Sequence, residues 1–298
     1  MFFLYINEPC IVVGKHQNLL SEINLQFVLE NNIKLSRRIS GGGTVYQDLN
    51  NLNFSYIHNC ANIEQVNYKK FTYPILESLR DMGLNVEFSD RNDLIIDTKK
   101  ISGNAMHIFK TRVLSHGTLL FNTNLNQLSA ALKNNPQKYI DKSIKSVRSK
   151  VTNISDYLSY PISMDEFSLL LFQKIFAISI NAVLEPITDS ENESINQILK
   201  QKFETWEWIF GYSPKYIFKN KFTLLNRIVE FQLLVEKGII RNVNSNIDQI
   251  ENLVYHHASE VLLNVKHDYQ KITELLTNHS VIKNHSEFNV SEFCENLF

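Results

Sequence analysis

The chain has 298 residues, of which 44% are hydrophobic and 20% are charged, and its formal net charge is −1. These values indicate a globular protein with room for a large domain and a smaller one, and they exclude bulk electrostatic attraction to nucleic acid or to a membrane surface. The cysteines Cys10, Cys60 and Cys294 lie far apart and form no C-x-x-C pair, which argues against a disulfide framework or a zinc ribbon. The apolar start is short and lacks the basic residues of a signal peptide, and no later stretch resembles a membrane span. We therefore expect a cytoplasmic protein.

Short strands dominate the first two thirds of the chain. Extended segments are predicted at 2–7, 11–13, 34–38, 44–46, 52–57, 86–88, 93–96, 100–105 and 113–121. Helical spacing predicts helices at 22–31, 66–82, 165–177 and 191–203, with Ser163 as a candidate N-cap. The segment 2–7 has the apolar composition of a buried strand. Hairpin strands with few helices predict an α+β fold with a mixed sheet.

An aromatic stretch at 204–210, followed by Gly211 and Pro214, indicates a domain boundary. We expect one domain at 1–213 and a smaller one at 214–298. The second is predicted to contain an antiparallel meander with a turn at Lys237-Gly238. Its strands are predicted at 215–218, 222–225, 228–236 and 239–244, and its helices at 248–254, 258–264 and 268–278. The neighbours His256 and His257 point in different directions, which argues against a shared metal site.

Three consecutive glycines, Gly41-Gly42-Gly43, follow Arg37-Arg38 between two predicted strands. Without β-carbons, their backbone N–H groups can converge on one point and form an anion-binding nest, to which Arg38 can add a charge with forked donors. A phosphate or a carboxylate is the natural guest. The alternative is a hairpin turn with solvated arginines, and the glycines alone favour it because such turns outnumber anion sites. The run matches neither G-x-G-x-x-G nor the P-loop pattern.

Three further features permit a functional or a structural reading. Lys100, close to Gly103, can neutralise a transferring phosphate or polarise a carboxylate oxygen, or it can belong to an exposed turn. His116 can be a base or a hydrogen-bonded core residue. A patternless segment, 134–153, is rich in cations and is either a solvated loop or a loop that faces phosphate. These cations are Lys138, Lys142, Lys145, Arg148 and Lys150.

Together these motifs resemble the lipoate-protein ligase A family. The segment 37–48 is similar to the R-R-x-S-G-G-G-x-V-[YF]-H-D signature of lipoate binding in that family. Further similar segments follow in family order at 14–18, 53–55, 91–94, 100–105, 115–119, 145–153, 206–208 and 235–238. The resemblance covers nearly the whole chain. It implies a catalytic domain of the biotin/lipoate ligase type with a mixed sheet, followed by a small α+β accessory domain.

The resemblance implies a reaction in two steps. Lipoate and Mg-ATP first give lipoyl-adenylate and pyrophosphate, and a lysine of an acceptor protein then attacks the mixed anhydride to form an amide. The implied acceptors are the lipoyl domains of 2-oxoacid dehydrogenase E2 subunits and the glycine cleavage H protein. The cofactors are ATP and Mg²⁺, with lipoate as substrate, and the enzyme is expected to be a monomer without affinity for nucleic acid or membrane.

The resemblance also assigns roles to single residues. Lys100 is the implied catalytic residue, an electrostatic clamp that contacts both ATP and the lipoate carboxylate. The other implied nucleotide contacts are Arg38, Gly43, Thr44, Val45 and Tyr46. Lipoate is implied to contact Ser40, Gly41, Gly42 and His116. The segment 145–153 resembles the adenylate-binding loop, with Ser146 and Arg148 facing the adenylate. Which residues hold the metal is left unassigned.

Two departures from the family pattern accompany these matches. Gln47 stands where histidine is usual and Asn50 where glycine is common, and family members carry a further strand and helix ahead of the segment that matches Phe2. Two other functions therefore stay open. A lipoyl or octanoyl acyltransferase would use a cysteine thiolate and no ATP, and a regulatory relative would bind lipoate without turnover. A biotin ligase has a different glycine loop.

Overall fold

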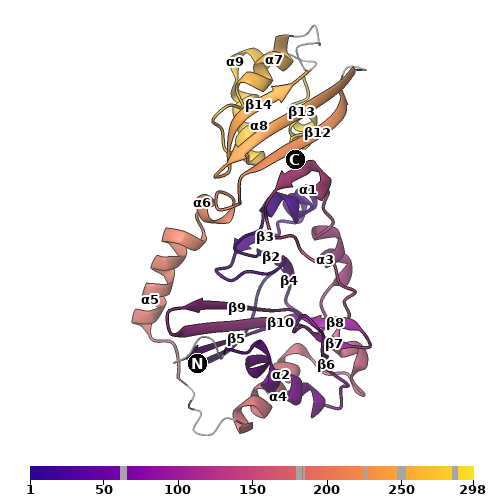
Figure 1. Ribbon diagram of the computed structural model, residues 1–298, viewed down its shortest axis with the longest axis vertical. Coiled ribbons are helices and arrows are strands. Elements are labelled where there is room, and N and C mark those ends of the chain that lie inside the picture. Colours follow the sequence, from indigo (N-terminus) through magenta and orange to yellow (C-terminus); the bar gives the residue numbers. More distant parts are fainter. Residues whose placement is uncertain (61–65, 179–182, 184, 225–226, 247–252, 284–287) are drawn as a thin grey trace. The chain divides into compact units, whose positions relative to one another are not determined.

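The computed structural model describes residues 1–60, 66–178, 183, 185–224, 227–246, 253–283 and 288–298 (Figure 1). Contacts divide the chain into two compact units. Unit 1 comprises Met1–Lys15, Ile33–Ala130 and Ser146–Ile195, and unit 2 comprises His16–Asn32, Ala131–Lys145 and Asn196–Phe298. We predicted a single cut between residues 213 and 214, whereas the contacts group two earlier segments with the C-terminal part.

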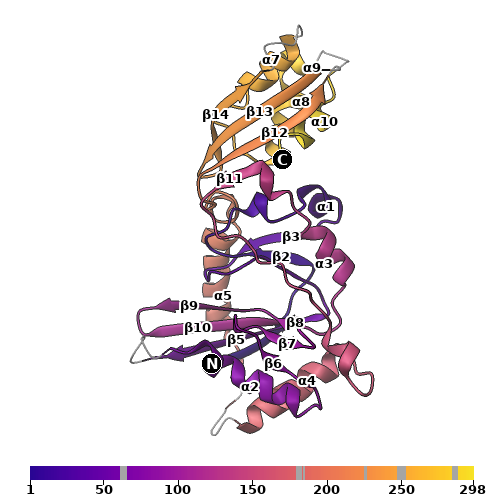
Figure 2. The ribbon, with the colours of Figure 1, turned by 45° about the vertical axis from the view of Figure 1, so that its right-hand side comes forward.

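Unit 1 is built around an antiparallel sheet with the order β1-β5-β10-β9. Its strands are β1 (Phe2–Ile6), β5 (Asn51–Asn59), β9 (Asn104–Phe109) and β10 (Arg112–Leu120). Helices α2 (Tyr68–Arg80) and α4 (Met164–Ile178) lie together below this sheet (Figure 2). Leu52 and Phe54 of β5, Leu79 of α2 and Phe167 of α4 belong to one buried apolar cluster. The predicted strands 2–7, 52–57 and 113–121 and the predicted helices 66–82 and 165–177 are confirmed, with shifts of a few residues at their ends, whereas β9 was not predicted over its observed length.

One prediction about this sheet is wrong. Strand β1 is not buried between other strands but forms an edge, because among the described residues it pairs only with β5. Phe3, Tyr5 and Ile6 are accordingly 37%, 40% and 38% exposed. An apolar strand at an edge cannot be distinguished from a central strand by composition alone.

Two smaller sheets complete unit 1. The first has the order β3-β2-β4, with β2 parallel to β3 and antiparallel to β4. The glycine run is therefore not a hairpin turn, since β3 and β4 flank β2 and do not pair with each other. The second sheet has the order β6-β7-β8, and the predicted strand 100–105 is interrupted at Gly103. The bounds are β2 (Cys10–Val13), β3 (Lys34–Arg37), β4 (Val45–Gln47), β6 (Glu87–Phe88), β7 (Leu94–Ile96) and β8 (Lys99–Ser102).

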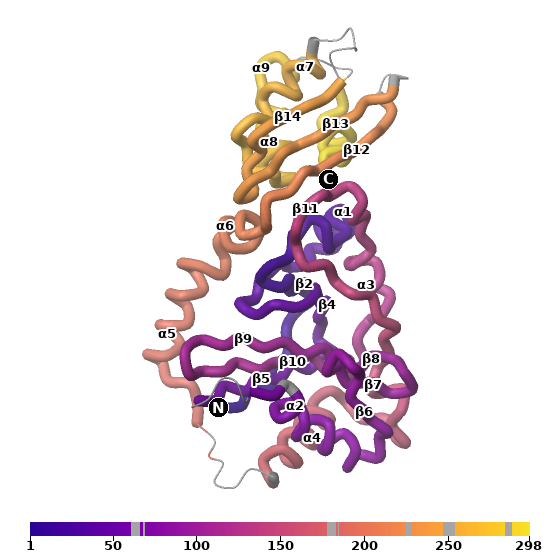
Figure 3. Tube along the Cα trace, in the orientation of Figure 1, coloured from indigo at the N-terminus to yellow at the C-terminus, as the bar shows by residue number. Residues whose placement is uncertain are grey.

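Unit 2 is built around a second antiparallel sheet, with the order β11-β12-β13-β14. Its strands are β11 (Tyr139–Asp141), β12 (Tyr216–Leu224), β13 (Arg227–Glu236) and β14 (Ile239–Ser245). The predicted strands 215–218 and 222–225 are one strand, β12. The turn at Lys237-Gly238 is confirmed, with φ values of 52° and 72°. Figure 3 shows β11 beside β12, with which it pairs.

Short helices accompany this sheet. They are α7 (Leu253–Glu260), α8 (Tyr269–Asn278), α9 (Ser280–Lys283) and α10 (Val290–Glu295). The predicted helix 258–264 is wrong, because α7 begins at Leu253 and the chain leaves it after Glu260. Residues 248–252 of the predicted helix 248–254 lie outside the described residues. α9 and α10 were not predicted.

The remaining helices are mostly short and lie between the strands and helices already named. They are η1 (Leu19–Ser21), α1 (Leu25–Glu30), α3 (Leu125–Ala131), η3 (Pro136–Lys138), η4 (Ile154–Tyr157), α5 (Asp189–Ile198), the π-helical η5 (Leu199–Phe203) and α6 (Trp206–Ile209). The predicted cap of α4 is confirmed: the backbone N–H of Glu166 donates to Ser163 Oγ at 3.2 Å, and that of Ser163 donates to Glu166 Oε2 at 2.7 Å. Within the described residues, no helix has the length and apolarity needed to span a membrane.

Candidate functional site

The glycine run is shaped by the side chain of Arg38. Its Nη2 donates to the carbonyl oxygens of Gly41 and Gly43, at 2.7 Å each, and its Nε donates to Gly41 at 3.2 Å. Its Nη1 donates to the carbonyl of Val12 in β2 at 3.0 Å. Gly42 has a φ of +91°, and a Cβ there would lie 3.0 Å from Arg38 Nη2. The loop therefore wraps around a guanidinium group.

Arg38 keeps an uncompensated positive charge at this loop. Burial lowers its pKa to about 10, so the side chain stays charged at neutral pH. Its acceptors are neutral carbonyl oxygens, and within the described residues no carboxylate lies at ion-pair distance from it. Its neighbour Arg37 is fully buried and donates to the carbonyls of Gly14 and Lys15, so the reading as solvated arginines is wrong for Arg37. A partly buried charge without a counterion favours the approach of an anion.

Ser40 and His116 form a polar pair beside the loop. Ser40 Oγ lies 2.6 Å from Nε2 of His116, which β10 presents opposite Ser55 and Ala105. Burial and, to a lesser extent, the charge of Arg38 lower the pKa of His116 to about 4. His116 is therefore a neutral imidazole at physiological pH and adds no charge to the loop.

Two segments that we predicted to share a ligand do meet. Ser146 Oγ accepts the backbone N–H of Thr44 at 2.9 Å. A Cβ on Gly43 would lie 3.1 Å from the same oxygen, so the absence of a side chain at Gly43 permits this contact. The start of the predicted adenylate loop thus packs on the glycine loop.

The far end of the adenylate loop runs beside Lys100. The backbone N–H of Lys100 donates to the carbonyl of Lys150 at 2.8 Å, and the N–H of Thr152 donates to the carbonyl of Lys100 at 3.1 Å. The ammonium group of Lys100 lies 3.0 Å from Oδ1 of Asp93. The site residues described so far all belong to unit 1. They are Arg38, Ser40, Thr44, Lys100, His116 and Ser146.

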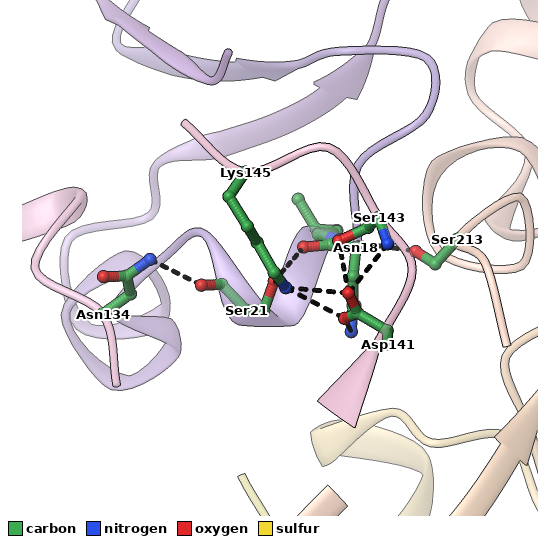
Figure 4. Close-up of polar contacts among 8 residues, drawn as sticks. Asn18, Ser21, Asn134, Asp141, Ser143, Lys145 and Ser213 are labelled. Carbon is green, nitrogen blue, oxygen red and sulfur yellow. Dashed lines mark hydrogen bonds and ion pairs between the residues drawn. The ribbon is translucent and has the colours of Figure 1, made fainter. Parts of the chain in front are cut away.

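Two predicted site residues, Tyr46 and Arg148, and Lys145 of the predicted adenylate loop are placed differently from the rest. The side chain of Tyr46 is only 2% exposed, its hydroxyl donates to Gln127 Oε1 at 2.7 Å, and burial raises its pKa to about 12. Arg148 is exposed. Lys145 belongs to unit 2, where its ammonium donates to Ser21 Oγ at 3.1 Å and pairs with Asp141 at 2.9 Å (Figure 4). Lys145 and the side chain of Tyr46 are therefore not part of the candidate site.

Figure 4 also shows polar residues that the sequence analysis missed. Asp141 accepts hydrogen bonds from Asn18 Nδ2 at 3.0 Å and from the backbone N–H and the hydroxyl of Ser143. The sequence signals for this group were the spacing of Asp141 and Lys145 by four residues and the place of Asn18 in the matched segment 14–18. Asp93 was also missed as a partner of Lys100, although it lies inside the segment 91–94.

Comparison with known proteins supplies the family. A profile of the lipoyl protein ligase A/B catalytic domain matches residues 1–176. The chain belongs to the lipoate-protein ligase A family. Lipoate-protein ligase 1 of Staphylococcus aureus is 37% identical, over 94% of this chain and 85% of that protein. A lipoate-protein ligase of Bacillus subtilis is 38% identical, over 91% of this chain and 87% of that protein.

Solved structures agree with this family assignment. A lipoate-protein ligase A bound with ATP superimposes with a TM-score of 0.61 and 27% identity, covering 71% of this chain and 85% of that one. A putative lipoate protein ligase from T. acidophilum with bound lipoic acid gives a TM-score of 0.60 and 28% identity, covering 70% and 85%. The predicted family and the α+β fold of the lipoate ligase type are confirmed.

Proposed function

We propose that this chain activates lipoate with ATP and transfers the lipoyl group to a lysine of an acceptor protein. One observation carries the proposal: the segment 146–152 is hydrogen-bonded to the glycine loop through Ser146 and to Lys100 at its other end. A single loop thus links the candidate phosphate nest to the lysine implied in catalysis. Relatives named lipoate-protein ligase support the same reaction.

The charges suit this chemistry. In the first step a carboxylate oxygen of lipoate attacks the α-phosphorus of ATP, the bond to the bridging oxygen of the β-phosphate breaks, and pyrophosphate leaves. Negative charge spreads over the phosphoryl oxygens, where loop N–H groups, Arg38 and Lys100 stabilise it. In the second step the acceptor amine attacks the acyl carbon, AMP leaves, and the nitrogen releases a proton as the amide forms. The enzyme itself forms no covalent bond.

Magnesium fits this scheme as part of the substrate Mg-ATP. Among the described residues, no three His, Cys, Asp or Glu side chains gather in a way that could hold a metal ion. Mg²⁺ commonly binds through substrate phosphates with few protein ligands, so a site without a carboxylate cage suits it. The ATP-bound relative supports nucleotide binding.

We extend the proposal to the individual contacts. Gly43, Thr44, Val45 and Tyr46 are proposed to contact the nucleotide, with Tyr46 acting through its backbone because its side chain is buried. Gly41, Gly42, Ser40 and His116 are proposed to contact lipoate, and Arg148 to face the adenylate. Residues 1–213 are proposed as the catalytic part and 214–298 as the accessory part.

The acceptors and the setting of the enzyme complete the proposal. A T. acidophilum lipoate protein ligase has been studied with its E2 lipoyl domain. Lipoyl domains of E2 subunits and the glycine cleavage H protein are the proposed acceptors. We propose a monomer in the cytoplasm. Cys10, Cys60 and Cys294 form no disulfide with one another, which agrees with the proposed compartment.

The cysteines argue against an acyltransferase that uses a thiolate. Burial raises the pKa of Cys10 to about 11 and also raises the pKa of Cys294. Both thiols are thus protonated at neutral pH and poorly nucleophilic. Cys60 comes directly after the end of β5 and belongs to none of the matched motifs.

The test is lipoate-dependent exchange of labelled pyrophosphate into ATP by the purified chain, with Lys100→Ala as a control. We expect exchange that needs lipoate and Mg²⁺ and that Lys100→Ala abolishes. Lipoate binding without exchange would contradict the ligase assignment and favour a regulatory relative. Acyl transfer without ATP would favour the acyltransferase.

A further inference from the structure

We propose that Asp93 is a positioning residue, which holds the ammonium group of Lys100 in place for the adenylation step. This inference rests on the proposed function and deepens it. Oδ1 of Asp93 lies 3.0 Å from Nζ of Lys100, and the two side chains are only 17% and 27% exposed. A half-buried ion pair restrains a lysine more than a pair in open solvent does.

Lys100 is confined on its other sides as well. Its backbone is tied to Lys150 and Thr152, and β7 pairs with β8 through a register shift between Leu94 and Ile95. Such bulges re-aim side chains next to functional sites. A Cβ on Gly103 would lie 3.1 Å from Cε and Nζ of Lys100, so the ammonium lies over a residue without a side chain. Only Asp93 gives this ammonium a charged contact among the described residues.

Asp93 is itself held by a tight turn. The hydroxyl of Ser89 accepts the backbone N–H groups of Arg91 and Asp93, at 3.2 Å and 3.1 Å. Ser89 N–H donates to the carbonyl of Asp93 at 2.9 Å. Asn92 adopts a φ of 61°, and its carbonyl accepts Nδ2 of Asn104 at 2.9 Å. These bonds fix the backbone of Asp93 and leave its carboxylate to Lys100.

This arrangement makes a specific kinetic prediction. Asp93 partly neutralises Lys100 before the substrate carboxylate arrives, so removing its charge leaves the attraction for that carboxylate equal or stronger. Without the restraint, the ammonium is no longer held where charge develops in the transition state. Asp93→Asn should therefore lower kcat of the exchange reaction about 10- to 100-fold, while the KM for lipoate stays equal or falls.

The experiment compares wild type, Asp93→Asn, Asp93→Ser and the control Asp90→Asn in pyrophosphate exchange, with the melting temperature of each. Asp90 is an exposed acid of the same turn, and its variant should behave as wild type. Both Asp93 variants should show the same split between kcat and KM at an unchanged melting temperature.

Three outcomes would overturn the inference. The first is a kcat within twofold of wild type. The second is a loss of kcat together with a higher KM for lipoate and a lower melting temperature. The third is a higher Mg²⁺ requirement, which would assign the carboxylate to the metal. A wild-type chain without exchange would instead contradict the proposed function.

Discussion

Arg38 uses most of its donors on the protein itself. A guanidinium has five N–H groups, and Arg38 makes four hydrogen bonds, to the carbonyls of Val12, Gly41 and Gly43. Arg38 therefore shapes the loop and supplies charge, and at most one of its N–H groups remains for a phosphate. Lysine cannot replace this fork, because its ammonium is a single point donor.

We accordingly expect Arg38→Lys to lower exchange activity by about 10- to 100-fold, although the charge is kept. The reason is that the lysine cannot make all the hydrogen bonds by which the guanidinium group holds the carbonyl groups of the loop. Initial rates of pyrophosphate exchange would measure the effect, and amide hydrogen exchange at 41–44 should become faster. Lys34→Arg, at an exposed ion pair in β3, is the matched control. Activity close to wild type would show that charge alone suffices.

At this scale the sequence identifies residues better than their pairings. The glycines, Lys100 and His116 were found because they stand in motifs with defined spacing. Ser40 and His116 are separated by 76 positions, and nothing local in either segment indicates that they touch. The ion pair of Lys100 with Asp93 depends on the pairing of β7 with β8, which periodicity does not reveal.

At the scale of elements, the end of β11 is anchored by one carboxylate. Burial alone would raise the pKa of Asp141, but hydrogen bonds from Ser143, Asn18 and Lys145 together lower it below its usual range. The anchor is therefore complete at neutral pH and is lost as pH falls through the lowered pKa. It lies just before the segment that contacts the glycine loop.

Asp141→Ala should lower the free energy of unfolding by about 2–3 kcal/mol, because several hydrogen bonds to a charged group disappear. Both tryptophans of the chain, Trp206 and Trp208, belong to unit 2, so their fluorescence during urea denaturation reports on this unit. Glu230→Gln, at an exposed ion pair of β13, should leave the midpoint nearly unchanged. Equal effects of the two variants would contradict the anchoring role.

A buried histidine makes unit 2 sensitive to acid. The carbonyl of Leu297 can only accept, so Nε2 of His267 carries the proton, and Nδ1 accepts from the hydroxyl of Tyr216 at 2.7 Å. Burial lowers the pKa of His267 to about 4, against smaller opposing effects of Leu297 and Asp268. Between pH 6.5 and 4 the unfolded chain thus binds more protons than the folded chain, and stability falls as pH falls.

We expect the lowered pKa of His267 to reduce the free energy of unfolding by up to about 3 kcal/mol as the pH falls from 6.5 to 4. Urea titrations at several pH values, followed by tryptophan fluorescence, would measure the slope. His267→Gln should be less stable at neutral pH but should lose this part of the slope. An unchanged slope in that variant would assign the acid sensitivity to other groups.

The elements themselves were largely predictable, and the exceptions have physical reasons. Strand β5 alternates polar and apolar residues at its start, and α2 repeats at helical spacing up to its end at Arg80. β12 was divided because the polar residues Lys219, Asn220 and Lys221 interrupt its apolar pattern. α9 has only four residues, too few for a period to be visible.

At the scale of the molecule, the accessory part is not separable by a single cut. β11 pairs with β12, and Leu20 and Tyr139 belong to the same apolar cluster as Tyr216, Phe218 and the C-terminal helices. Removing 214–298 would expose that apolar surface and leave β11 without its partner strand.

We therefore expect the fragment 1–213 to be partly unfolded or to aggregate, rather than to fold as an independent catalytic domain. Size-exclusion chromatography and circular dichroism would measure this. The full-length chain is the control and should stay monodisperse. A compact and active 1–213 fragment would contradict the prediction.

The strand order β3-β2-β4 determines which segments must accompany the glycine loop if the loop is grafted into another protein. The glycine loop crosses the end of β2, to which Arg37 and Val45 are both registered through Val13 and Val12. A loop longer or shorter by one residue would shift β4 by one position and turn the buried Tyr46 to the opposite face. Grafting the glycine loop into another scaffold would thus require all three strands, with Arg38, as one cassette.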